Sequence, residues 1–142
     1  MIEDIIIGSL AEAEIPEAVV LWKACNLTRP WNDPYADAML ALSSPSSSIL
    51  AARQGNALVG TIMVGHDGHR GAVYYVGVLP DLQKSGIGAL LMAAAEQWLK
   101  DRGVPKLNVM VRTDNLGARG FYERLGYEPS EVIVISKRLD ER

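Results

Sequence analysis

The chain has 142 residues, of which 49% are hydrophobic and 22% charged, and its formal net charge is −3 at pH 7. This length suits one domain with a buried core, which we expect over residues 1–142. The small negative charge gives no general attraction to nucleic acid or to an anionic membrane, so neither is expected as a partner. One cysteine, Cys25, excludes an internal disulfide, and no apolar run is long enough to span a bilayer. These features favour a cytoplasmic protein.

A first strand and two helices are expected near the N-terminus. Residues 5–7 form a β-branched run that is typical of a strand. In residues 13–25 the apolar side chains recur at helical spacing. Asp33 followed by Pro34 is a typical helix start, an N-cap before a proline at the first helical position. This start predicts a second helix over residues 34–42.

Strands dominate the middle of the chain. The turn signal at residues 54–56, QGN, predicts a hairpin between strands over residues 49–53 and 57–65. Asp67 and Gly68 form the strongest class of two-residue hairpin turn, and predict a further hairpin into a strand over residues 72–78. These pairs are antiparallel.

The last part of the chain predicts two helices and two strands. A helix over residues 88–102 is followed by an alternating strand over residues 107–112, and Asn115 can cap the next helix. Residues 132–136 predict a last strand. A strand–helix–strand unit implies a parallel, right-handed crossover. The expected fold class is therefore α/β, a single mixed and mostly antiparallel sheet with helices on both faces.

Two glycines, Gly86 and Gly88, lie where a loop becomes a helix, in the run LPDLQKSGIGALL. Glycines let a ligand approach the backbone, and the unpaired N–H groups that begin a helix favour an anion. A Walker loop, GxxxxGK[ST], is absent from the sequence, and the dinucleotide fingerprint GxGxxG lacks its third glycine here. Two interpretations remain open on these residues alone, a phosphate-binding turn and a strand-to-helix connection without a ligand.

The pattern Gln83-x-x-Gly86-x-Gly88 resembles the pyrophosphate-binding turn of the GNAT superfamily, the acyl-coenzyme A-dependent N-acetyltransferases. The apolar-x-Val-x-Pro pattern before it, VGVLP, is similar to that family. So is the segment from Asn115 to Tyr127, Asn-x-x-Ala-x-x-Phe-Tyr-x-x-x-Gly-Tyr. The stretches CNLTRPWNDP and GHDGHRGAVYYVGVLP are similar to the small bacterial YpeA-type acetyltransferases. The resemblance implies the GNAT acetyltransferase fold, with a splayed parallel strand pair, and acetyl-CoA as cosubstrate.

The glycine turn and the strand before it are the expected cofactor site. Backbone N–H groups of the turn can converge on a pyrophosphate, and the helix dipole adds attraction. Coenzyme A also carries pantetheine, an extended chain with amide groups. These amides can pair with a strand edge, as a peptide does, if the strand splays from its neighbour. Gly77 would mark the bulge that causes the splay, or it is a small residue under a packed helix. Ser85 stands where the family often has a basic residue or glycine, which gives Lys84 more of the attraction. The expected cofactor-binding residues are Val76, Val78, Gln83, Lys84, Ser85, Gly86, Ile87, Gly88, Ala89 and Asn115.

Acyl transfer to an amine requires a deprotonated amine, a stabilised oxyanion and a proton for the leaving thiolate. A backbone N–H within residues 76–78 is the candidate oxyanion donor. By pattern Tyr122 is a core residue on an apolar helix face, but the resemblance implies that it is the general acid. The general base is left open among Asp33, Asp67, His69, a water relay and capture of a neutral amine.

The resemblance places the acceptor near the loop of residues 26–33. The expected acceptor-binding residues are Arg29, Trp31, Asp33, Asp67 and His69. The alternative is a loop pinned by a buried Trp31, in which Asp33 acts only as a helix cap. His66 and His69 lack a third ligand nearby in sequence, so no metal is expected. Cys25 is interpreted as a buried structural thiol.

The sequence therefore predicts an N-acetyltransferase that moves an acetyl group from acetyl-CoA to a primary amine by direct attack. The acceptor would be a small-molecule or peptide amine. The alternative is a non-catalytic acyl-CoA-binding or sensory module, which would keep the glycine turn and lose the acid. Pairing through residues 132–136 would give a homodimer.

Overall fold

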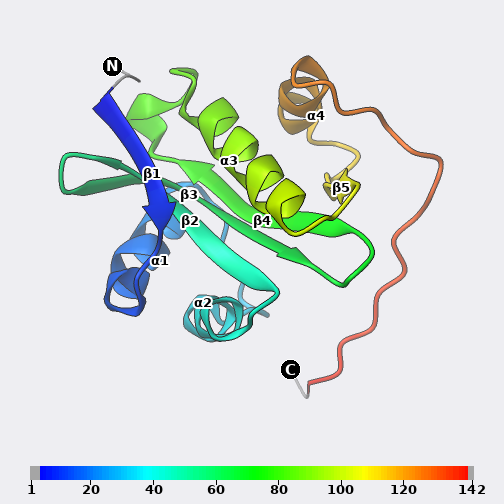
Figure 1. Cartoon of the computed structure of the whole chain (residues 1–142), viewed down its shortest axis with the longest axis horizontal. Helices are drawn as coiled ribbons and strands as arrows, with labels where there is room; N and C mark the ends of the chain where they lie inside the picture. The colour runs from blue at the N-terminus through cyan, green and yellow to red at the C-terminus, as the bar shows by residue number, and fades with distance from the viewer. Residues whose placement is uncertain (1–3, 141–142) are drawn as a thin grey trace. The chain divides into compact units, whose positions relative to one another are not determined.

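The structure is a computed structural model that describes residues 4–140, and it consists of two compact units. The first unit ends at Val109 and the second begins at Met110. The chain runs from blue to red along these units in Figure 1. None of the helices in residues 4–140 combines the length and apolar character needed to cross a membrane.

A mixed sheet organises the first unit. Its strands lie side by side in chain order, β1-β2-β3-β4-β5, and the first four are antiparallel to their neighbours. The pair of β4 and β5 is parallel. The expected mixed and mostly antiparallel sheet is therefore confirmed. The strands are β1 (Ile5–Ser9), β2 (Ser47–Gln54), β3 (Ala57–His66), β4 (Gly71–Val78) and β5 (Leu107–Asn108) (Figure 1).

Helices cover both faces of this sheet. On β3, a Cβ added to Gly60 would lie 3.0 Å from the Leu91 side chain of α3 (Ile87–Asp101). The next residue, Thr61, accepts a 2.8 Å hydrogen bond from the indole of Trp22 in α1 (Ile15–Ala24). Successive strand residues point to opposite faces, so α1 and α3 lie on opposite sides. Helix α2 (Pro34–Ser43) shares the buried core of α1.

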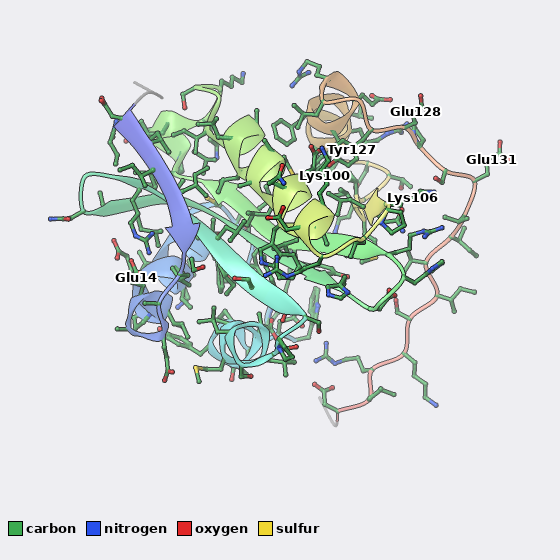
Figure 2. All side chains as sticks on the ribbon, in the orientation of Figure 1. Glu14, Lys100, Lys106, Tyr127, Glu128 and Glu131 are labelled. Atoms are coloured by element: carbon green, nitrogen blue, oxygen red, sulfur yellow. The ribbon has the colours of Figure 1, made fainter. Side chains whose placement is uncertain are left out.

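Local signals explain how these elements begin and end. Asp33 caps α2 as expected, since its carboxylate accepts from the N–H groups of Tyr35 (3.0 Å) and Ala36 (3.2 Å). Two short 3₁₀ turns, Glu12–Glu14 and Pro80–Leu82, precede α1 and α3. Glu14, labelled in Figure 2, accepts a hydrogen bond from Arg53 of β2 at 3.1 Å. This contact links the N-terminal end of α1 to the sheet.

Two expected boundaries differ from the structure. Strand β2 begins at Ser47, two residues before the expected start, because its partner β3 extends to His66 and pairs with these serines. The turn at Asp67 spans four residues between His66 and Gly71 instead of two. The carboxylate of Asp67 accepts from the N–H groups of residues 69 and 70, which stabilises this longer turn.

Strand β4 carries a bulge opposite β3. Thr61 pairs with Gly77 and Met63 pairs with Tyr74, so two residues of β4, Tyr75 and Val76, lie opposite one residue of β3. Tyr75 has a φ of 50°, a left-handed value that is uncommon for a residue with a large side chain. The expected bulge therefore exists, with its left-handed residue two positions before Gly77.

Gly77 has the other role considered for it, a small residue under a helix end. A Cβ at this position would lie 2.9 Å from Leu27 and 3.3 Å from the Cys25 sulfur. A Cβ here would require Leu27 and Cys25 to shift, which explains why glycine fits best.

The parallel pair of β4 and β5 is short. It holds only Gly71 opposite Leu107 and Ala72 opposite Asn108, whereas β4 continues to Val78. The expected strand over residues 107–112 is therefore wrong in its length. The expected splay is confirmed, and it leaves the β5-side edge of β4 open beyond Ala72 within the described part of the first unit.

The second unit contains helix α4 (Leu116–Arg124). Asn115 is its N-cap, as expected, and its side-chain oxygen accepts from the N–H of Ala118 at 3.1 Å. Residues 132–136, expected to be a strand, have no strand structure, and Ile133 is 83% exposed. A strand needs a neighbour for its backbone hydrogen bonds, and no strand occurs in the described residues of this unit.

Candidate active site

The turn before α3 has the backbone geometry of an anion site. Lys84 and Gly86 both have left-handed φ values, 64° and 96°. Gly86 is the N-cap of α3 and has no side chain, so no side-chain cap bonds to the first N–H groups of the helix. Left-handed residues in such turns direct neighbouring N–H groups to one side, and the helix dipole adds positive potential there. The arrangement can hold a phosphate group.

Hydrogen bonds tie this turn to the end of β4. The Gln83 side chain donates to the carbonyl of Val78 at 3.1 Å, and the Cys25 thiol donates to the same oxygen at 3.1 Å. The hydroxyl of Ser85 donates to the carbonyl of Leu82. Gln83 and Ser85 therefore stabilise the turn itself. Lys84 is exposed, and its ammonium group provides positive charge at the turn.

The Cys25 thiol matches its interpretation as a structural group, although it is half-buried. Burial raises its pKa, and the hydrogen bond to Val78 only partly offsets this. The thiol is therefore protonated at neutral pH and is a poor nucleophile.

Residues of the turn and of β4 differ in burial along the expected cofactor site. Gln83, Lys84, Ser85 and Gly86 are exposed, whereas Ile87 is buried and anchors the start of α3. Gly88 and Ala89 are partly exposed in the first helical turn. On β4, Val76 lies in the bulge and Val78 ends the strand. The structure thus brings most of the expected cofactor-binding residues onto one turn and the strand that enters it.

Tyr122 lies in the second unit, on the same helix that Asn115 caps. Its ring meets those of Phe121 and Tyr127 edge to face, with centroids 5.0 and 5.9 Å apart. Burial raises the pKa of the Tyr122 hydroxyl. The hydroxyl therefore stays protonated at neutral pH, as a general acid requires.

The residues expected to bind the acceptor make local contacts. The guanidinium of Arg29 donates to the carbonyls of Asn26 (2.9 Å) and Thr28 (2.8 Å), and so stabilises its own loop. Trp31 is 47% exposed, so the interpretation of a buried, loop-pinning Trp31 is wrong. Asp67 is exposed, and the hydrogen bonds from its own turn lower its pKa.

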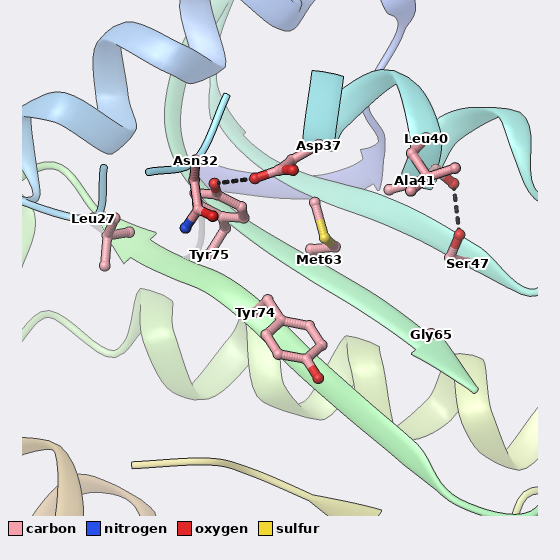
Figure 3. A pocket seen from close by; sticks show the side chains of 10 residues that line it. All are labelled: Leu27, Asn32, Asp37, Leu40, Ala41, Ser47, Met63, Gly65, Tyr74 and Tyr75. Atoms are coloured by element: carbon pink, nitrogen blue, oxygen red, sulfur yellow. Dashed lines mark hydrogen bonds between the residues drawn. The ribbon is translucent and has the colours of Figure 1, made fainter. Parts of the chain in front are cut away.

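An open pocket of about 480 Å³ lies on the α1–α2 side of β3 and β4 (Figure 3). The residues expected to bind the acceptor are absent from its lining, although Asn32 of the same loop contributes. The lining residues are Leu27, Asn32, Asp37, Leu40, Ala41, Ser47, Met63, Gly65, Tyr74 and Tyr75.

Two adjacent tyrosines, Tyr74 and Tyr75, both line this pocket. In a regular strand they would point to opposite faces, but the left-handed backbone of Tyr75 breaks the alternation. The hydroxyl of Tyr75 donates to the Asp37 carboxylate at 2.7 Å (Figure 3). Burial first, and this carboxylate second, raise the pKa of Tyr75 well above its usual range. Nothing in the sequence joins Tyr75 to Asp37, because the two residues lie 38 positions apart and no spacing rule relates them.

Comparisons with known proteins agree with this geometry. The model of the acetyltransferase (GNAT) family matches residues 14–127. An acetyltransferase of Yersinia enterocolitica is 44% identical over 128 residues, which cover 90% of this chain and 91% of that protein. The chain therefore belongs to the GNAT acetyltransferase family, whose cosubstrate is acetyl-CoA.

Solved structures show the same fold at low sequence identity. The aminoglycoside N-acetyltransferase AAC(6′)-Iy, in complex with the bisubstrate analogue CoA-S-monomethyl-acetylneamine, aligns with a TM-score of 0.81 at 17% identity, over 94% of this chain and 97% of that one. The ribosomal-protein-S18-alanine N-acetyltransferase of Escherichia coli aligns with a TM-score of 0.76 at 22% identity, over 89% and 79%. The five-stranded sheet with its short parallel pair is thus the GNAT fold.

Proposed function

We propose that this acetyltransferase moves the acetyl group of acetyl-CoA directly to a primary amine, with Tyr122 as the general acid. The turn before α3 carries the proposal. Its residues Lys84 and Gly86 have left-handed backbones, and the glycine at the N-cap leaves the N-terminus of a fifteen-residue helix without a side-chain cap. A doubly charged pyrophosphate is the part of coenzyme A that such a turn suits.

The coenzyme would extend from the turn along β4. Its pyrophosphate binds the backbone of residues 84–89, and its pantetheine amides pair with the edge of β4 that β5 leaves open. Val76 and Val78 are the strand residues beside this edge, with Gln83 and Ser85 holding the turn. Asn115 is proposed as a further contact to the cofactor.

The reaction then requires a nucleophilic attack by the amine and the departure of the coenzyme A thiolate. The neutral amine nitrogen attacks the thioester carbonyl carbon, the new C–N bond forms, and the carbonyl oxygen becomes an oxyanion near an N–H of residues 76–78. The oxyanion collapses and the C–S bond breaks. The thiolate takes a proton from the Tyr122 hydroxyl, and the extra proton of the amine passes to solvent through a base.

The acceptor is proposed to be a small-molecule or peptide amine. Relatives in fold are named for an aminoglycoside and for a ribosomal-protein alanine, so one scaffold accommodates both acceptor types. Arg29, Trp31 and Asp33 on the loop before α2, with Asp67 and His69 on the β3–β4 turn, are proposed to face it.

An acceptor screen tests this function. The protein is mixed with acetyl-CoA and a panel of polyamines, aminoglycosides, amino-acid amides and peptides, and release of free thiol is followed together with the mass of an acetylated product. We expect amine-dependent thiol release. Tight binding of acetyl-CoA with no transfer to any amine would instead favour the non-catalytic acyl-CoA-binding module.

A further inference from the structure

We infer that Asp37, positioned by the Tyr75 hydroxyl, binds an ammonium group of the acceptor and selects small cationic amines that carry no carboxylate beside the amine. The inference rests on the proposed acetyl transfer and names the substrate class for it. It concerns the pocket of about 480 Å³ between α2 and the bulged end of β4.

The first support is charge. Asp37 is the one residue with a formal charge among the ten that line the pocket. Within residues 4–140, no lysine or arginine forms an ion pair with it. Asp37 is half-buried and its Oδ2 accepts from the neutral Tyr75 hydroxyl, so its second oxygen can accept from a ligand. An ammonium group is the complementary partner.

The second support is the strained backbone that places Tyr75. A left-handed conformation for a bulky residue persists only where the surroundings enforce it, and such positions cluster at ligand sites. Three contacts enforce it here. The ring stacks on Trp22 with centroids 4.1 Å apart, the carbonyl accepts from the Thr61 hydroxyl at 2.9 Å, and the phenol reaches Asp37.

The position along β4 joins this pocket to the proposed chemistry. Tyr75 directly precedes Val76, the first of the three residues whose N–H groups are candidates for the oxyanion. The ammonium group held at Asp37 first loses one proton to a base, and the neutral amine then approaches from the α1–α2 side of the strand that carries the thioester. This is the side on which both tyrosines line the pocket.

The remaining lining sets the rest of the specificity. Leu27, Leu40, Met63 and the Tyr74 ring give apolar walls, and Asn32 and Ser47 add neutral polar groups. A carboxylate on the acceptor would meet the negative charge of Asp37 and no basic residue of the lining. Decarboxylated amines and amides are thus favoured over free amino acids, since a like charge in a partly buried site is repelled.

The test uses matched acceptors that differ only next to the amine. Phenethylamine, phenylalaninamide and phenylalanine form one set, and agmatine, argininamide and arginine form the other. Steady-state acetylation with acetyl-CoA is measured for the wild type, Asp37→Asn, Tyr75→Phe and the control Asp101→Asn. Asp101 is an exposed carboxylate at the end of α3, outside the pocket. Calorimetric binding of agmatine to the protein saturated with coenzyme A gives a readout independent of turnover.

We expect kcat/KM for the amine and the amide to exceed that for the acid by at least tenfold in one or both sets. Asp37→Asn should raise the acceptor KM by tenfold or more, weaken agmatine binding similarly and reduce the discrimination against the acid, while the KM for acetyl-CoA stays within twofold. Tyr75→Phe keeps the ring stacked and should raise the acceptor KM less. Asp101→Asn should behave as wild type.

Each contrary outcome has a separate meaning. Equal use of acids and amines, or an Asp37→Asn variant that is folded by circular dichroism and unchanged in acceptor KM and agmatine affinity, overturns the inference. Transfer to another amine of the screen but to none of these six also overturns it, and leaves the acetyltransferase proposal standing. Failure to acetylate any amine contradicts that proposal as well.

Discussion

Tyr75 stacks its ring on the fully buried indole of Trp22, with centroids 4.1 Å apart and planes inclined by 24°. The indole N–H of Trp22 in turn donates to Thr61, whose hydroxyl donates to the carbonyl of Tyr75. The two aromatic residues are thus joined both by their rings and through one hydroxyl. This closed set of contacts connects the core of the first unit to the bulge of β4.

Thr61→Val should therefore destabilise the protein. The substitution leaves a buried indole N–H without its acceptor and the bulge carbonyl without its donor, and such losses cost about 1–3 kcal/mol each. Chemical denaturation should show a lower midpoint with an unchanged m value. Thr61→Ser keeps the hydroxyl and should recover most of the loss. Equal stability of the valine variant and the wild type would show that these hydrogen bonds contribute nothing.

Gly86→Val should weaken coenzyme A binding by roughly tenfold or more, which corresponds to about 1.4 kcal/mol. Its φ of 96° disfavours any side chain, and a branched one would lie where the phosphates are proposed to bind. Affinity is measured by calorimetry.

Gly103→Val is the matched control, because Gly103 also has a positive φ (75°) but lies after the other end of α3. Both variants should lose stability through backbone strain, whereas only the first should lose affinity. Unchanged coenzyme A affinity in a folded Gly86→Val protein would rule out the turn as the pyrophosphate site.

Glu14→Gln should change how stability depends on pH. The hydrogen bond from Arg53 first, and that from the N–H of Ala11 second, lower the pKa of Glu14. A lowered folded-state pKa means that the stabilisation is present above the unfolded pKa and is lost as the pH falls through the folded value. The pair lies at the surface, where solvent screens it, so the effect should stay below about 1 kcal/mol.

Unfolding free energies of the wild type and of Glu14→Gln should accordingly differ at pH 7 and converge in strong acid. Glu12→Gln, in the same 3₁₀ turn, serves as the control. A difference between the wild type and the Glu14→Gln variant that persists below the folded pKa would show that the carboxylate charge is not its source.

Local sequence signals account for much of the fold. The N-caps Asp33 and Asn115, the glycine at the start of α3 and the hairpin at residues 54–56 all act within a few residues of the chain. Each acts through groups that are close together in the chain, so a single sequence contains enough information to place them.

The bulge and the pocket depend instead on contacts between distant segments. From the sequence, Gly77 is either the bulge residue or a small residue under a packed helix. The left-handed residue is instead Tyr75, because Trp22 and Asp37 hold its ring and hydroxyl there. Asp37 itself is 38 residues from Tyr75 in sequence. No propensity or spacing rule relates such positions, which is why the sequence pointed to the glycine turn and missed this pocket.

Tyr122→Phe should lower kcat by roughly 10²–10⁴, the usual effect of removing a general acid. The variant keeps the ring and its edge contacts with Phe121 and Tyr127, and removes only the hydroxyl. Coenzyme A affinity, measured by calorimetry, should change much less than kcat.

The pH dependence adds an independent signature. An acid must be protonated, and burial raises the pKa of Tyr122, so any loss of rate through its ionisation should begin only above the ordinary tyrosine pKa of about 10. Tyr127→Phe, which removes a hydroxyl from the neighbouring ring and keeps the ring contact with Tyr122, is the matched control and should retain the wild-type kcat. A Tyr122→Phe enzyme that turns over within a few-fold of the wild type, with chemistry rate-limiting, would mean that the thiolate leaves unprotonated or takes its proton from water.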